Sequence, residues 1–109
     1  MSDSDIVIEQ KIRETIKRLT REPVDTTEFK TRFEEETGWE YTFDSFPKLL
    51  KEEQKGRWTY ETRECVDYVD IDETTYVSIH AVELWVVDYE KGDMYIDFID
   101  IKEIKVNKE

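Results

Sequence analysis

Residues 76–87, YVSIHAVELWVV, decide the expected fold because β-forming residues dominate them. Valine, isoleucine, tyrosine and tryptophan are enriched in strands, where branched and aromatic side chains pack well on a pleated surface. The flanking residues 57–71 and 94–106 also place apolar side chains at a period of two. Between these runs, residues 72–74 (DET) and 90–93 (EKGD) have turn composition, and the second turn offers a glycine for positive φ. The second half of the chain is therefore predicted to form three or four antiparallel strands.

The first half of the chain has helical periodicity instead. Apolar residues recur every three or four positions, which predicts an amphipathic helix over residues 4–21. These apolar residues are Ile8, Ile12, Ile16 and Leu19. A second helix is expected from Asp25, which has the position of an N-cap, to Gly38, which is placed to end it. Phe29 and Phe33 lie one turn apart on that helix and would face the same side.

A third helix is predicted over residues 45–55. Ser45 or Asp44 can cap its first turn, Pro47 is tolerated there, and Gly56 follows its expected end. Three helices followed by strands indicate a single acidic α+β domain over residues 1–109, with the helices packed on a C-terminal antiparallel sheet of three to four strands. Winged-helix domains have the same order of elements, so a winged-helix-like core is an alternative.

The charge of the chain is strongly negative and unevenly distributed. The sequence holds 28 acidic and 16 basic residues, a formal net charge of −12 at pH 7. Residues 61–100 contain 12 acidic residues and only two basic ones, Arg63 and Lys91, so this stretch alone carries −10. Because the stretch has the pattern of strands and not of a disordered tail, we expect a folded acidic surface. Such a surface repels nucleic acid and attracts basic protein surfaces.

This acidic surface favours a small binding protein without enzymatic activity. Alternate residues of a strand, such as Asp70 and Asp72, lie about 6.6 Å apart, close to the separation of successive phosphates along a DNA strand. We therefore hypothesise that the protein inhibits or modulates a partner by docking on the partner's basic, nucleic-acid-binding surface. A DNA mimic or a virus- or phage-encoded anti-defence protein would have this character. The predicted partner-binding residues are Glu64, Asp67, Asp70, Asp72, Glu73, Asp88, Glu90, Asp93, Asp97 and Asp100.

Two other functions fit parts of the sequence. Basic residues at helical spacing would share one face of the third helix or follow it directly, and a winged-helix-like regulator could bind DNA through them. These residues are Lys48, Lys51, Lys55 and Arg57. Alternatively, the carboxylates of residues 67–73 could hold Mg²⁺ or Ca²⁺ in a metal-dependent enzyme.

Other residues that could carry chemistry are scarce. His80 is the only histidine and lies within an apolar strand run, where a solvent-facing or locally bonded histidine is the expected role. Cys65 is the only cysteine and is expected to be a small buried residue. One cysteine and one histidine cannot complete a four-ligand zinc site within a chain. We therefore predict no metal, no cofactor and no catalytic residue.

Location and association are inferred from sparse signals. A single cysteine cannot form an intrachain disulfide, and no apolar run is long enough to span a bilayer. Residues 1–10 lack the pattern of a signal peptide, so the cytoplasm is the expected location. Tyr76, Trp85 and Tyr95 are candidates for an exposed sheet face, which would allow a homodimer or a partner contact.

Overall fold

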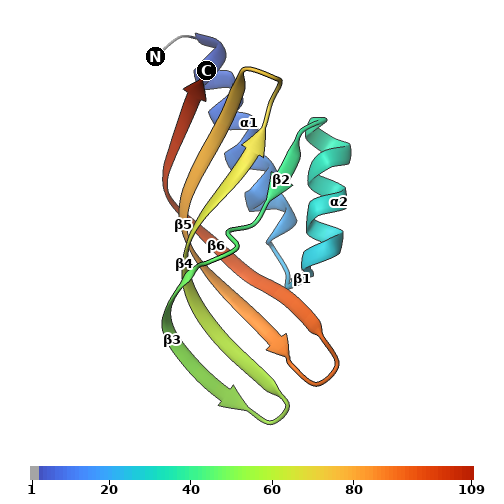
Figure 1. The fold of residues 1–109 in the computed structure, drawn as a ribbon. Helices are drawn as coiled ribbons and strands as arrows, with labels where there is room; N and C mark the ends of the chain where they lie inside the picture. The colour runs from blue at the N-terminus through green and yellow to red at the C-terminus, as the bar shows by residue number, and fades with distance from the viewer. Residues whose placement is uncertain (1–2) are drawn as a thin grey trace.

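A computed structural model describes residues 3–109 and shows a long, curled antiparallel sheet with two helices on one of its faces (Figure 1). The helices are α1 (Asp3–Leu19) and α2 (Thr26–Thr37). The strands are β1 (Val24–Asp25), β2 (Glu40–Thr42), β3 (Lys48–Lys55), β4 (Trp58–Asp70), β5 (Thr75–Asp88) and β6 (Asp93–Lys108). Strands hold more than half of the described residues, so this part of the chain is mostly β.

The predicted fold class, three helices on a sheet of three to four strands, is wrong. Residues 48–55 form strand β3 instead of a helix, and the sheet within residues 3–109 has six strands. β3 pairs with β4 as far as Lys55 opposite Trp58, so Gly56, with a φ of 61°, makes a hairpin turn instead of ending a helix. Every residue of β3 is exposed, including Leu49 and Leu50, so the apolar side chains that a helix would have turned toward the core remain in solvent. The winged-helix alternative fails as well because it requires the third helix.

The sheet is built around three long strands. The order of pairing is β1-β6-β5-β4-β2, and β3 also pairs with β4. β2 pairs with residues 68–70 of β4, whereas β3 pairs with residues 58–64. These two strands therefore line the same edge of β4, one after the other (Figure 1).

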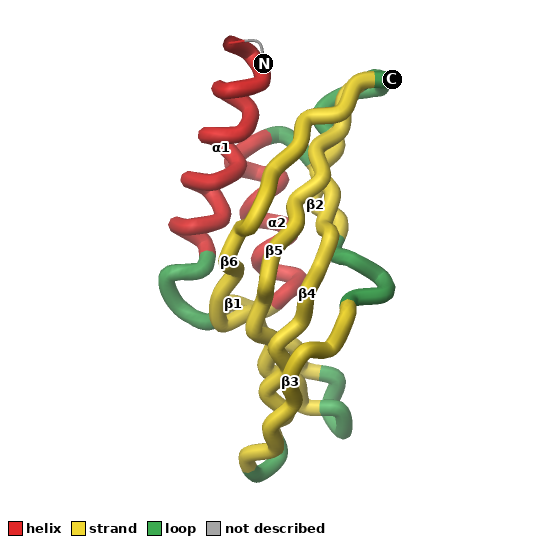
Figure 2. The backbone as a smooth tube through the Cα atoms, turned by 90° about the vertical axis from the view of Figure 1, so that its left-hand side faces the viewer, coloured by secondary structure: helices red, strands yellow, loops and turns green. Residues whose placement is uncertain are grey.

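Two bulges interrupt the pairing of β5 with β6. The register shifts after His80 and after Leu84 of β5, which leaves Lys102 and Asp97 of β6 as the extra residues. An extra residue bends a strand and increases its local twist. We attribute the curl of the sheet, visible from the side in Figure 2, to these bulges and to the ordinary twist of long strands.

The hydrophobic core lies between the two helices and one face of the sheet. Its buried apolar residues include Ile12, Ile16, Leu19, Phe29, Phe33, Tyr41, Val69, Val77, Ile79, Ala81, Ile96 and Ile104. Aromatic rings run through it from Phe29 to Tyr41, Phe43 and Trp85, with successive centroids 5.0, 5.0 and 5.2 Å apart. The helices lie beside one end of the sheet only, so the β3–β4 and β5–β6 hairpins extend beyond them (Figures 1 and 2).

The local features predicted for the first two helices are confirmed. The apolar stripe of α1 faces the core. Asp25 caps α2, since its Oδ1 accepts hydrogen bonds from the backbone N–H groups of Thr27 and Glu28 at 2.9 and 3.3 Å. Gly38 ends α2 in the left-handed conformation, with a φ of 77°. The two predicted turns join β4 to β5 and β5 to β6.

Removing an aromatic ring from the core should destabilise the fold strongly. Phe33 is fully buried, and its ring centroid lies 5.1 Å from that of Tyr41. Phe33→Ala is expected to lower the free energy of unfolding by about 3–5 kcal/mol, because it leaves a cavity. The control is Phe46→Ala, at a side chain that is 93% exposed, with an expected change below about 0.5 kcal/mol. Urea unfolding followed by circular dichroism measures both, and equal losses would contradict this packing.

Candidate functional site

The predicted acidic residues do not form one surface. One group lies at the turn between β4 and β5: Asp70, Asp72 and Glu73. A second group lies at the turn between β5 and β6: Asp88, Glu90 and Asp93. The two turns are at opposite ends of the 14-residue strand β5, roughly 45 Å apart at about 3.3 Å per residue. Between them, on the sheet face that the helices leave uncovered, are Glu64, Asp97 and Asp100.

Two of the predicted acids are buried. Asp67 is 0% exposed and lies on the helix-covered face of β4. Asp88 is also buried, and its carboxylate accepts hydrogen bonds from the backbone N–H groups of Glu90 and Lys91 at 3.1 and 3.2 Å. The second oxygen of Asp88 lies 3.6 Å from Nε of Arg57. The structure therefore removes Asp67 and Asp88 from the predicted partner-binding surface and gives them roles inside the fold.

Exposed acids gather where α2 ends and where β4 turns into β5. Glu40 lies directly opposite Asp70 in the sheet register, and the following turn adds Asp72 and Glu73. The last turn of α2 contributes residues 34–36, all glutamates, and contains no basic residue. We call this surface the acidic end. Its seven exposed residues are Glu34, Glu35, Glu36, Glu40, Asp70, Asp72 and Glu73.

The acidic end is only slightly neutralised by the protein's own cations. Arg18 forms an ion pair with Glu36 at 2.6 Å, and within residues 3–109 the other six members make no ion pair. Asp72 accepts hydrogen bonds from the backbone N–H groups of Thr74 and Thr75 at 2.9 and 2.8 Å. These bonds, first of all that from Thr74, lower the pKa of Asp72 below its ordinary value.

The expected strand alternation of Asp70 and Asp72 is wrong. Asp70 is the last residue of β4, whereas Asp72 lies in the turn that follows. The spacing of alternate strand residues therefore does not apply to this pair. The carboxylates of residues 67–73 also fail to converge as a metal-dependent enzyme would require, because Asp67 faces the core and the others lie at the exposed end of the sheet.

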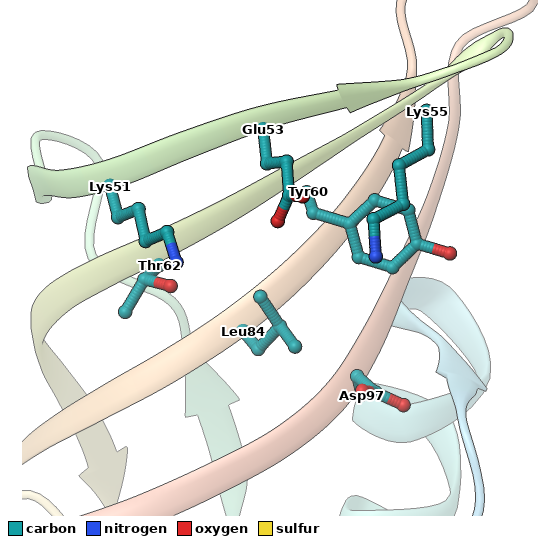
Figure 3. A pocket seen from close by; sticks show the side chains of 7 residues that line it. All are labelled: Lys51, Glu53, Lys55, Tyr60, Thr62, Leu84 and Asp97. Carbon is teal, nitrogen blue, oxygen red and sulfur yellow. The ribbon is translucent and has the colours of Figure 1, made fainter.

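The predicted DNA-binding lysines lie on an edge strand and not on a helix. Lys51 and Lys55 line an open hollow of about 320 Å³ on the uncovered sheet face (Figure 3). The same hollow contains Glu53 from β3 and Asp97 from β6, so its charge is mixed. Lys55 also lies over the ring of Tyr60, with Nζ 4.9 Å from the ring centroid. These contacts describe a polar, partly aromatic surface and not a continuous cationic track.

The remaining basic candidates are engaged locally. Lys48 lies opposite Glu64 in the sheet register, and Glu64 also lies 3.7 Å from Nε2 of the exposed His80. Arg57 lies over the ring of Trp58, with 4.7 Å between the guanidinium carbon and the ring centroid. The solvent-facing position expected for His80 is confirmed.

The predicted aromatic face is correct for two of its three residues. Tyr76 and Tyr95 lie on the uncovered face, and Tyr95 contacts Trp58 with ring centroids 5.8 Å apart. Trp85 lies on the other face and is buried. Its Nε1 donates a hydrogen bond to Oε1 of Glu83 at 2.8 Å.

A polar cluster lies inside the helix-covered face of the sheet. Cys65 and Asp67 of β4 and Glu83 of β5 are all buried, and one ligating atom from each lies within 4.8 Å of the others. Tyr41 donates its hydroxyl proton to Oδ2 of Asp67 at 2.6 Å, and the backbone N–H of Asp44 donates to Oδ1 at 2.9 Å. We call Tyr41, Cys65, Asp67 and Glu83 the buried acid cluster. The burial predicted for Cys65 is confirmed.

Burial controls the protonation of this cluster. Loss of solvent, followed by the neighbouring carboxyl group of Asp67, raises the pKa of Glu83 to about 9. Burial, followed by the charges of Glu83 and Asp67, raises the pKa of the Cys65 thiol far above its ordinary value. Near neutral pH, Glu83 is therefore a neutral acid and Cys65 a neutral thiol.

Sequence reasoning missed Glu83, although a signal for it was present. Glu83 lies between Ala81 and Trp85 in an alternation of inward-facing residues that begins at Val77, and an acid at such a position must be buried. The role of Tyr41 had no comparable local signal, because it depends on the pairing of β2 with β4.

Comparisons with models of protein families, with curated proteins and with solved structures found no match. Across residues 3–109, neither helix is both long enough and apolar enough to cross a membrane. The longer helix, α1, carries charged residues in every turn.

The raised pKa of Glu83 makes stability depend on pH. Between about 4.5, the ordinary value, and about 9, the folded value, the unfolded chain loses a proton that the folded protein keeps. The free energy of unfolding should therefore fall as pH rises through this window, by up to about 1.4 kcal/mol per pH unit from this group. Glu83→Gln has the shape of the neutral acid and cannot ionise, so its stability should fall less steeply.

Urea unfolding between pH 6 and 8.5, in the presence of EDTA, tests this expectation. The matched control is Glu103→Gln, at an exposed position of β6, which should keep the slope of the wild type. Equal slopes for wild type and Glu83→Gln would contradict a neutral Glu83 in the folded protein.

Proposed function

We propose that this protein is a small acidic binding protein without enzymatic activity, which inhibits or modulates a partner by docking on the partner's basic, nucleic-acid-binding surface. The observation that carries the proposal is the acidic end. Six of its seven carboxylates have no cationic partner within the described chain, and all seven are exposed. A partner with clustered lysines and arginines would supply the missing positive charge.

The acidic end is arranged at a cost to stability. Glu40 and Asp70 are like charges directly opposite each other in the sheet, a placement that destabilises by about 0.2–1 kcal/mol. Residues 34–36 place negative charge at the C-terminal end of α2, where each charge opposes the helix dipole by roughly 0.3 kcal/mol or more. A sequence selected for stability alone would favour lysine or arginine there. The arrangement supports a requirement for negative surface charge.

In the proposed complex, carboxylates take positions that nucleic-acid phosphates would otherwise occupy. The protein then acts as a DNA mimic and competes with nucleic acid for the partner. A virus- or phage-encoded anti-defence protein is the kind of antagonist that suits this mode of action, and the cytoplasm is the proposed location. Direct DNA binding is the weaker proposal, because Glu53 and Asp97 line the same hollow as Lys51 and Lys55 and the net charge of −12 opposes a polyanion.

Neutralising the acidic end should weaken binding without weakening the fold. The test variant is Glu40→Gln, Asp70→Asn and Glu73→Gln combined, which leaves the turn-forming Asp72 intact. The control removes three charges elsewhere at exposed positions, with Glu14→Gln, Glu90→Gln and Glu103→Gln. Because two like charges no longer oppose each other, the test variant should be at least as stable as the wild type.

Proteins captured by the wild type from cell extract at low salt provide the partner for this test. For the purified partner, the dissociation constant should rise about 10-fold or more for the test variant and less than about 3-fold for the control. Binding should also weaken between 0.1 and 0.5 M salt, and duplex DNA should compete. Equal losses in both variants, or binding that salt does not affect, would contradict docking through the acidic end.

A further inference from the structure

The buried acid cluster places three potential metal ligands around one point. Cys65 and Asp67 are two residues apart on β4 and so point to the same face, and Glu83 reaches them from the neighbouring strand β5. Ala81 lies opposite Cys65 in the register. One ligating atom from each of the three residues lies within 4.8 Å of the other two. Small movements of the three side chains would bring these atoms close enough together to bind one metal ion.

A second observation concerns Glu83 itself. Its Oε1 accepts the hydrogen bond from Trp85, but its Oε2 has no hydrogen-bond partner among residues 3–109, although the side chain is 0% exposed. Buried polar atoms without a partner are rare, and an ion is one of the standard reasons for them. The unpartnered Oε2 belongs to the cluster that also contains a thiol and a second carboxylate.

We propose that Cys65, Asp67 and Glu83 form a zinc-binding site inside the fold. Zn²⁺ accepts thiolate sulfur together with carboxylate oxygen, whereas Mg²⁺ and Ca²⁺ prefer oxygen ligands alone. A water molecule would complete four-fold coordination. The donors already bonded to the carboxylates, Tyr41 and Asp44 for Asp67 and Trp85 for Glu83, would orient the ligands as outer-shell partners do in metal sites.

Entry of the ion requires a local opening. The cluster is covered at one edge by the connection between β2 and β3, where Asp44 accepts a hydrogen bond from the N–H of Val66 at 2.8 Å and donates one to Asp67. β2 has only three residues, so this edge holds few backbone hydrogen bonds. Local opening of such a short segment requires less free energy than unfolding of the whole protein.

The test uses the full-length protein freed of metal with EDTA and then titrated with ZnCl₂ or CoCl₂. Zinc should raise the melting temperature of the wild type, because the folded state alone has the assembled site. Co²⁺ should produce the near-ultraviolet charge-transfer absorption of a cobalt–thiolate bond, since Cys65 is the only cysteine. Cys65→Ser should abolish that band and most of the rise in melting temperature. Glu83→Gln should weaken zinc binding about 10-fold or more, because the loss of even an outer-shell partner costs roughly 10- to 100-fold.

Two controls separate this site from surface binding. His80→Gln removes the exposed His80–Glu64 pair, and the neutralised acidic-end variant removes exposed carboxylates; both should keep the full response. If Cys65→Ser does not fold, Glu83→Gln, which resembles the neutral acid, provides the comparison. The proposal is overturned if the wild type shows neither a cobalt–thiolate band nor a rise in melting temperature. It is equally overturned if either control loses the response while Cys65→Ser or Glu83→Gln keeps it.

Discussion

The sheet is much longer than the two helices that pack on it, and this difference in length decides which part of the sheet is buried in the core. β5 and β6 contain 14 and 16 residues, and α1 and α2 contain 17 and 12. A residue advances about 3.3 Å along a strand but only about 1.5 Å along a helix. The helices therefore cover only part of one face. Beyond the helices, the same face carries Glu61 and Arg63, which form an ion pair. The guanidinium of Arg63 also covers the ring of Trp85, and the guanidinium carbon lies 4.4 Å from the ring centroid.

The elements that could be predicted from the sequence depend on residues close together in the chain. The apolar stripe of α1, the capping of α2 by Asp25 and Gly38, and the hairpin at Gly92 all belong to this class. β3 could not be predicted in the same way. Its charged, exposed sequence suits a surface helix as well as an edge strand, and the deciding factor is pairing with β4 across the turn at Gly56. Hairpin pairing with β4 therefore overrode a set of plausible helix signals.

In the candidate sites, too, the features that depend on neighbouring residues in the chain could be predicted, and those that depend on strand pairing could not. The exposed acids of residues 70–73 could be predicted because their turn composition is local. The contribution of Glu40 could not, because it depends on the register between β2 and β4. The inward position of Glu83, in contrast, follows from the alternation of inward and outward residues along β5. It was missed because charged residues are normally expected to face solvent. Its burial is tolerated because Trp85 donates a hydrogen bond to it and it keeps its proton.

β3 is an edge strand, because among residues 3–109 it pairs only with β4 and all eight of its residues are exposed. Such an edge offers free backbone N–H and C=O groups to strands of other molecules. Lys48, Lys51 and Lys55 hinder that pairing, since an added strand would have to crowd their ammonium groups, and the bulge at Leu50 breaks the regular edge. The lysines that suggested contact with DNA thus lie where their charge opposes edge-to-edge pairing with another strand.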